Sequence, residues 1–189
     1  MLSLLLAMLG APASPDVLIN EQIQYYRIEG SSPNELAEQM QARGPVQPLT
    51  GRRSNALTYW TVTWSHHGES HEGGCRVSDV DVMVNIVMTL PQWAGEQGNQ
   101  PLAREWRRYA SSVQEHEYVH RQHAREAAIA VRNALWAVPY QPGCDELERA
   151  MNRAARKELK RFAALSRQYD AQTGFGTTQG ARLRQVSRP

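Results

Sequence analysis

Two stretches in the first half of the chain alternate between apolar and polar residues. Residues 56–64, ALTYWTVTW, and residues 75–91, CRVSDVDVMVNIVMTLP, place an apolar residue at almost every second position. A period of two residues is typical of a strand that buries one face. The polar segment 66–74, HHGESHEGG, lies between them, so we expect a loop there that joins the strands into an antiparallel hairpin. On the second strand, six side chains share the apolar face: Val80, Val82, Val84, Ile86, Met88 and Leu90.

A third strand and a short helix are predicted before this hairpin. Residues 19–30, INEQIQYYRIEG, are rich in residues that favour strands, and they end at a glycine. Ser32 is a suitable N-cap, Pro33 fits the first helical position, and the helix that follows should stop before Gly44. We therefore expect the N-terminal half to form a small antiparallel sheet with one short helix.

The C-terminal half has the apolar spacing of two long helices. The first opens at Pro101 and runs without glycine or proline to Val138. The second begins at Asp145, where Asp-Glu-Leu-Glu resembles a capping box, and continues to about Tyr169. A short connection between two long helices indicates an antiparallel helical hairpin. The whole chain is therefore predicted to be α+β, with the sheet and the short helix followed by the helical hairpin.

Composition restricts the class of protein only loosely. The chain has 189 residues, enough for one domain with a core, and its apolar fraction of 41% and charged fraction of 21% are ordinary. A formal net charge of +2 is too small to indicate nucleic-acid binding, and aromatic residues are not interleaved with basic ones. We therefore expect a globular protein without a nucleic-acid partner.

The first residues predict export. Residues 1–13, MLSLLLAMLGAPA, form an apolar run that ends in a small-residue pattern typical of signal-peptide cleavage sites. The run is too short to span a bilayer. We expect cleavage after Ala13, which would leave residues 14–189 as a single domain in the periplasm or outside the cell, without stable membrane insertion.

Export to an oxidising compartment would allow the two cysteines to form a disulfide. Cys75 and Cys144 are the only cysteines in the chain, so a disulfide has one possible connectivity. Neither lies in the sequence context of a catalytic thiol, and an oxidising compartment disfavours zinc–thiolate ligation. We therefore predict a Cys75–Cys144 disulfide bond.

Residues 116–120, HEYVH, fit the His-Glu-x-x-His pattern of zinc hydrolases. On a helix, His116 and His120 project from one face and can reach a single zinc ion, while Glu117 between them is placed to act as a general base. At about 100° per residue, both histidines share a stripe with the apolar residues of the first long helix, so they should point toward the core. The alternative is a buried histidine pair that binds no metal.

A catalytic zinc site needs a third protein ligand. If residue 141 lies near the midpoint of the helical hairpin, His120 is level with about residue 162, and the carboxylate of Glu158 is the nearest on the apolar stripe of the second helix. Arg161 is a possible ion-pair partner that would give Glu158 a structural role instead. Asp170 lies off the stripe at the expected helix end, where a turn could bring it inward. The residues alone leave Glu158 and Asp170 open.

The remaining histidines have weaker patterns. His123 lies too far from His116 to share its ion comfortably, so it is expected to face substrate or to be polar surface, and it is a candidate, with Tyr169, for stabilising an oxyanion. Those of the 66–74 segment are expected to lie in a polar hairpin loop: His66, His67 and His71.

The chain resembles the DUF922 family of bacterial proteins, which are described as predicted secreted zinc-dependent proteases. HEYVH on a long helix, the CDEL start of the next helix and YDAQTGFGTTQGARL near the end carry the resemblance, together with YYRIEGSSPNELAEQM, ALTYWTVTW, GGCRV and TLPQW. In that family a Tyr-Asp-x-x-Thr-x-His-Gly motif is expected near the end. Tyr169, Asp170, Thr173 and Gly176 match it, while Phe175 stands at the histidine position.

The resemblance bears on the third ligand. If the family uses that histidine, this chain has lost a ligand at Phe175, whereas if it uses the aspartate, Asp170 carries over unchanged. The recurring Tyr-Asp pair favours Asp170, which we take with His116 and His120 as the expected ligands of Zn²⁺.

Two functions of different classes follow. The first is an exported zinc metallohydrolase, most simply a metallopeptidase with Glu117 as general base and a peptide or protein as substrate. The second is a non-catalytic envelope module that binds a partner, with or without zinc. The oligomeric state is not predicted.

Overall fold

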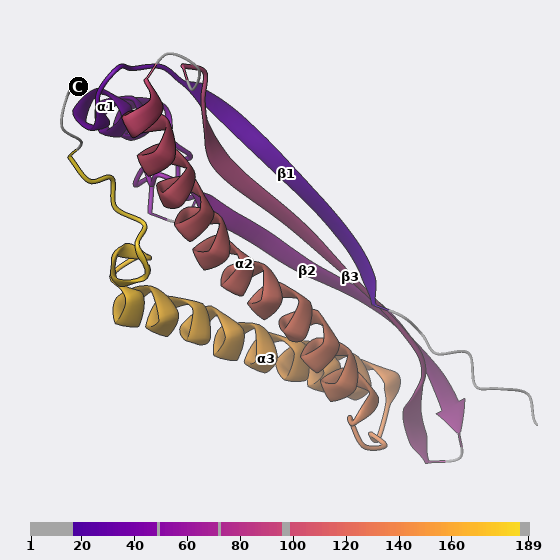
Figure 1. Ribbon diagram of the computed structural model, residues 1–189. Helices are drawn as coiled ribbons and strands as arrows, with labels where there is room; N and C mark the ends of the chain where they lie inside the picture. Colours follow the sequence, from indigo (N-terminus) through magenta and orange to yellow (C-terminus); the bar gives the residue numbers. More distant parts are fainter. Residues whose placement is uncertain (1–16, 49, 72, 96–98, 186–189) are drawn as a thin grey trace, which may run out of the picture.

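The described part of the chain has an α+β fold, as the alternation and helical spacing predict. A computed structural model describes residues 17–48, 50–71, 73–95 and 99–185 (Figure 1). The signal peptide expected at residues 1–13 lies outside this part of the chain. The elements in chain order are β1 (Leu18–Ile28), α1 (Pro33–Arg43), β2 (Leu57–His71), β3 (Gly74–Trp93), α2 (Gln100–Trp136), α3 (Cys144–Thr173) and the short 3₁₀ helix η1 (Thr177–Gln179).

The sheet has three strands in the order β1-β3-β2. β2 and β3 form the predicted antiparallel hairpin, with Val62 opposite Val84. β1 differs from the expectation, because it pairs with β3 in parallel, with Ile19 opposite Val84. β3, the second arm of the hairpin, is the central strand, and it runs in the same direction as β1. Alternation shows which face of a strand is buried but carries no information on the direction of its neighbour.

The polar segment 66–74 is mostly strand rather than loop. β2 continues to His71 and β3 begins at Gly74, with an irregularity in register between His67 and Gly68. The hairpin therefore extends past the core as a two-stranded ribbon. In this ribbon the strands are paired by backbone hydrogen bonds. Because the side chains are mostly polar on both faces, the sequence has no apolar alternation that would predict the strands.

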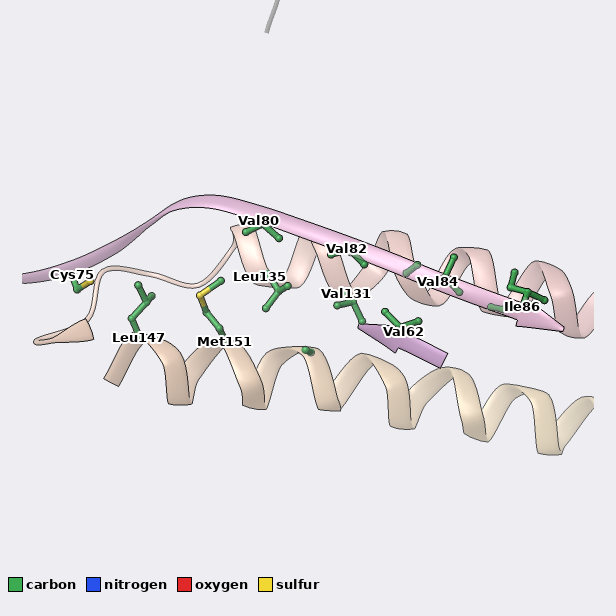
Figure 2. Packing of buried hydrophobic residues seen from close by; sticks show 13 residues of the cluster. Val62, Cys75, Val80, Val82, Val84, Ile86, Val131, Leu135, Leu147 and Met151 are labelled. Atoms are coloured by element: carbon green, nitrogen blue, oxygen red, sulfur yellow. The ribbon is translucent and has the colours of Figure 1, made fainter. Parts of the chain in front are cut away.

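The predicted apolar face of β3 is the centre of the core. All six of its side chains from Val80 to Leu90 are buried. α2 packs against the face of the sheet to which they point. Figure 2 shows Val131 and Leu135 of α2 beside this strand, with Leu147 and Met151 of α3 next to them. α2 lies along β3 with one buried stripe, which fixes its rotation about its own axis. Among the described residues, no helix is long and apolar enough to cross a membrane.

The predicted disulfide is present between Cys75 and Cys144, whose Cα atoms are 5.0 Å apart. It joins the start of β3 to the first residue of α3. Backbone hydrogen bonds between Cys75 and Gln141 in both directions, at 2.8 and 2.9 Å, hold the same junction. Closing a loop with a sequence separation of 69 residues stabilises the fold by about 4 kcal/mol on the chain-entropy model.

The ends of the helices follow the sequence in part. Ser32 caps α1, with its hydroxyl accepting from the Glu35 amide at 3.3 Å. The capping box expected at Asp145 does not form, because α3 starts one residue earlier and its N-cap, Gly143, has no side chain. α3 also continues beyond Tyr169, to Thr173. Asp170 is therefore inside the last turns of the helix and needs no turn to bring it inward.

Candidate metal centre

α2 brings His116, Glu117 and His120 to its buried side. Their exposed fractions are 5%, 6% and 9%, in a helix whose neighbouring positions Glu115 and Tyr118 are exposed. The apolar stripe of α2 is what turns them inward, since Val113 and Ala124, one turn before and after, pack in the core. A solvated helix face is therefore ruled out for these residues.

Asp170 of α3 meets the two histidines. Its Oδ1 lies 2.9 Å from His120 Nε2 and 3.3 Å from His116 Nε2, and the two Nε2 atoms are 3.3 Å apart. These three atoms form a compact triangle between the helices. Among the described residues, it is the one group of three or more histidine, cysteine or acidic side chains that could hold a metal ion.

The three atoms of this triangle carry lone pairs and a negative charge that favour a bound proton or metal ion. His116 Nδ1 lies 3.0 Å from Gln179 Oε1, which only accepts, so Nδ1 carries the hydrogen and Nε2 directs a lone pair at the triangle in neutral His116. Burial opposes ionisation of Asp170, but hydrogen bonds with His116 and His120 outweigh it and lower its pKa to about 2. Burial likewise lowers the pKa of His116, but hydrogen bonds with Asp170 and Gln179 raise it overall. A proton or a metal ion therefore balances the charge.

The spacing of the triangle suits zinc. Zinc–nitrogen and zinc–oxygen bonds of about 2.0–2.1 Å in a tetrahedron put neighbouring ligand atoms about 3.3 Å apart. The two separations of 3.3 Å match that edge, and the 2.9 Å between His120 Nε2 and Asp170 Oδ1 is slightly shorter than it. Two imidazoles and one carboxylate are also the ligand types and number found in catalytic zinc sites.

Glu117 is held against the sheet rather than in the triangle. The Thr58 hydroxyl on β2 donates to Glu117 Oε2 at 2.7 Å and also approaches its backbone carbonyl at 3.2 Å. Burial raises the pKa of Glu117, against the lowering effects of the Thr58 hydrogen bond and of His120 and His116. The described residues give no hydrogen bond to Oε1, so this oxygen is free to accept a proton.

Tyr169 and Gln179 form the outer wall of the centre. The Tyr169 ring stacks on His116, with ring centroids 4.8 Å apart and planes at 17°. Its hydroxyl lies 3.1 Å from Gln179 Oε1 and 3.0 Å from Gln179 Nε2. Gln179 thus contacts both the ring that covers His116 and the ring nitrogen that fixes its orientation.

The chain after α3 turns back over the centre at glycines. Gly176 has a φ of 81°, which favours glycine, and a Cβ there would lie 3.0 Å from Ala181 Cβ and 3.1 Å from His116 Cγ, so a larger residue would press on the His116 ring. The Arg108 guanidinium on α2 then donates to the carbonyls of Gly180 at 2.7 Å and Arg182 at 2.5 Å. This tether holds η1, and with it Gln179, against His116.

The other singled-out residues lie apart from the triangle. The Glu158 carboxylate accepts from Arg161 at 2.8 Å, which is the structural role considered from the sequence. His123 Nδ1 is 3.1 Å from the Ser166 hydroxyl. Phe175 is 73% exposed, with a φ of 54°. The three histidines of the 66–74 segment lie on β2 and are not in the metal group: His66, His67 and His71.

Thr58 and Gln179 were not singled out from the sequence. Thr58 is one polar position of an alternating strand, and its partner is 59 residues away. The glycine-rich GFGTTQG segment signals that the chain turns sharply after α3, but not that it turns toward His116. Both residues act through contacts between distant parts of the chain.

Replacing Gln179 by alanine is expected to weaken zinc binding by about 10–100-fold, because His116 loses the partner that holds its Nδ1 hydrogen and its ring orientation. The measurement is competition for zinc against a chromophoric chelator, at constant pH. Gln172→Ala, which changes an exposed glutamine at the end of α3, is the matched control and should leave the affinity unchanged. Equal affinity in both variants would show that Gln179 does not position His116.

Comparison with known proteins identifies the family and nothing closer. The family model of DUF922, described as a bacterial protein of unknown function, matches residues 23–176. No curated protein and no solved structure matches the chain. The matched range runs from β1 through Asp170 to Gly176 and covers both helices of the metal centre. With this match over most of its length, the chain belongs to the DUF922 family.

Proposed function

We propose that this protein is an exported zinc-dependent hydrolase that cleaves peptide bonds. The observation that carries the proposal is the convergence of His116 Nε2, His120 Nε2 and Asp170 Oδ1 within a triangle of zinc-ligand dimensions. A buried glutamate follows the first of these ligands directly in the helix. A carboxylate in this position, next to a ligand but outside the triangle, is placed to act as the general base of a zinc hydrolase.

His116, His120 and Asp170 would hold the zinc. When bound, zinc supplies Lewis acidity, which polarises a substrate carbonyl and lowers the pKa of an attacking water. Glu117 accepts a proton from the attacking water at Oε1, while the Thr58 hydroxyl holds Oε2 and so fixes the direction of the carboxylate. The same carboxyl then donates the proton to the leaving amine nitrogen. Tyr169 keeps His116 in place by stacking, and Gln179 keeps its Nε2 free of hydrogen.

The disulfide supports a site of action in an oxidising compartment. A Cys75–Cys144 bond is stable in oxidising compartments such as the periplasm or the extracellular medium, which supports the export expected from residues 1–13. Peptides or unfolded proteins are the proposed substrates there. The exposed position of Phe175 supports the proposed ligand set. His116, His120 and Asp170 meet without a side chain from position 175.

Removing zinc should abolish hydrolysis, and restoring it should recover it. Protein treated with a zinc chelator and dialysed is assayed on an unfolded protein and on a mixture of quenched fluorescent peptides, before and after the addition of zinc. We expect turnover only in the reloaded sample. Turnover in metal-free protein would reject the mechanism. A reloaded protein that binds zinc firmly and cleaves none of the substrates would favour the non-catalytic envelope module.

A further inference from the structure

The exposed side of α3 carries a dense group of positive charges. Between positions 149 and 169 the sequence has a single acidic residue, Glu158, although the whole chain has a net charge of only +2. The rest of the chain is therefore net acidic. Seven basic residues fall in this stretch, and all are exposed: Arg149, Arg153, Arg156, Lys157, Lys160, Arg161 and Arg167.

Five of these residues form one straight line. At about 100° per residue, they fall within an arc of about 60° and extend for about 27 Å along the helix. The buried residues Met151, Ala155 and Phe162 lie on the opposite side, against the core. The line therefore points directly away from the protein. We call it the basic stripe: Arg149, Arg153, Arg156, Lys160 and Arg167.

The charge of the basic stripe is largely uncompensated within the protein. Arg149 forms an ion pair with Glu146 in the first turns of α3. In the part of the chain that the structure describes, the other four have no carboxylate within ion-pair distance: Arg153, Arg156, Lys160 and Arg167. Glu158 pairs instead with Arg161, outside the stripe. Such a row repels itself, and an external anionic surface would relieve the repulsion.

Shape and chemistry favour a flat surface of phosphate groups. Arg149, Asn152, Arg153 and Arg156 line a shallow hollow at the start of the stripe, whose walls are mainly the aliphatic parts of these side chains. Guanidinium groups, which three of these residues carry, pair well with phosphate groups. A straight helix offers its cations to a plane along its whole length. The stripe contains no aromatic residue to stack on bases, which disfavours single-stranded nucleic acid.

The compartment narrows the choice further. The disulfide indicates an oxidising space of the kind reached by export, and the membrane that borders such a space presents an extended surface of lipid headgroups. Small residues such as Ala163 and Ala164 flank the stripe, so it has no large apolar side chain to insert between lipids. Adsorption would therefore be electrostatic and peripheral.

We propose that the basic stripe of α3 docks the protein onto an anionic phospholipid surface. This would hold the protein along the membrane by the same helix that carries Asp170 near its C-terminal end. The inference does not depend on zinc or hydrolysis, because it rests on the charges of α3 and on the oxidising compartment that the disulfide indicates.

The test is sedimentation with lipid vesicles. The exported protein is mixed with vesicles of phosphatidylcholine alone or with phosphatidylglycerol added. Salt is set at about 0.1 M or about 1 M, between which the screening length falls from about 10 Å to about 3 Å. Arg153→Gln/Arg156→Gln removes two stripe charges, and Arg52→Gln/Arg104→Gln removes two exposed charges elsewhere. Every variant is purified after export from the same host, so residues 1–13 are processed alike in all of them.

We expect binding only to the phosphatidylglycerol vesicles at low salt. The affinity for these vesicles should fall about 30-fold in the stripe variant, because each of the two basic residues contributes roughly fivefold. The control variant should change by less than about threefold. No preference for phosphatidylglycerol, or an equal loss in both variants, would overturn the proposal. Binding to a DNA duplex that exceeds vesicle binding and is lost in the stripe variant would also overturn it, by identifying nucleic acid as the partner.

Discussion

Glu117→Gln is expected to lower kcat for peptide hydrolysis by about 10²–10⁴-fold while zinc remains bound, since an amide cannot accept the proton that a general base must take. The fold should be preserved, because the Thr58 hydroxyl can donate to the amide oxygen of glutamine as it does to Glu117 Oε2. The measurement combines the rate of cleavage of a quenched peptide with zinc content for the same preparation. An unchanged zinc content separates loss of the base from loss of the metal.

The control for this variant lies two residues away. Glu115→Gln changes an exposed glutamate on the same helix, bonded to Ser111, and should keep full activity. Turnover in Glu117→Gln comparable to that in Glu115→Gln would show that Glu117 is not the base. Hydrolysis would then proceed without Glu117, and the proposed mechanism would be rejected.

Asp170→Ala is expected to weaken zinc binding by roughly a hundredfold or more, because it removes a ligand and its negative charge, a larger loss than that of an outer hydrogen-bond partner. Asp170 Oδ1 is the only oxygen donor in the triangle formed by the described residues. Loss of the carboxylate leaves two imidazoles, too few for a stable protein site. Affinity is measured by competition with a chelator, as for Gln179→Ala.

Glu158→Ala provides the comparison, because this carboxylate was the rival third ligand. Its partner is Arg161, away from the triangle, so its loss should leave zinc affinity unchanged. A large loss of affinity in Glu158→Ala with little in Asp170→Ala would place the metal elsewhere along α3.

Much of the fold and the orientation of the histidines could be predicted because both follow from local periodicity. The six alternating apolar side chains of β3 are all buried, and the helical spacing of apolar residues in α2 is enough to put His116 and His120 on its core side. The direction of β1 could not be predicted, since it depends on which arm of the hairpin lies beside it.

The sequence predicted less well which residues of α3 lie beside His116 and His120. Counting outward from residue 141 put His120 beside about residue 162, whereas it contacts Asp170, about two turns further along α3. Figure 1 shows the reason, since α2 and α3 cross at an angle instead of running in register. Crossing angles come from side-chain packing over the whole interface and cannot be read from the length of the connection.

The contacts of Thr58 and Gln179 were beyond local reasoning as well. Thr58 is 59 residues from Glu117, and Gln179 is 63 residues from His116. A threonine on a strand and a glutamine after a glycine-rich turn have many ordinary roles. Only the packing of β2 and of the C-terminal segment on α2 gives them a place at the centre.

The most direct test of the zinc centre is the metal content of untagged protein purified from the periplasm, compared between the wild type and His116→Ala. The account predicts one zinc ion per chain in the wild type and none in the variant, with both proteins folded by circular dichroism. Absence of zinc from the wild type, even after reconstitution with the metal, would contradict it and leave HEYVH as a pair of buried histidines in a packed helix.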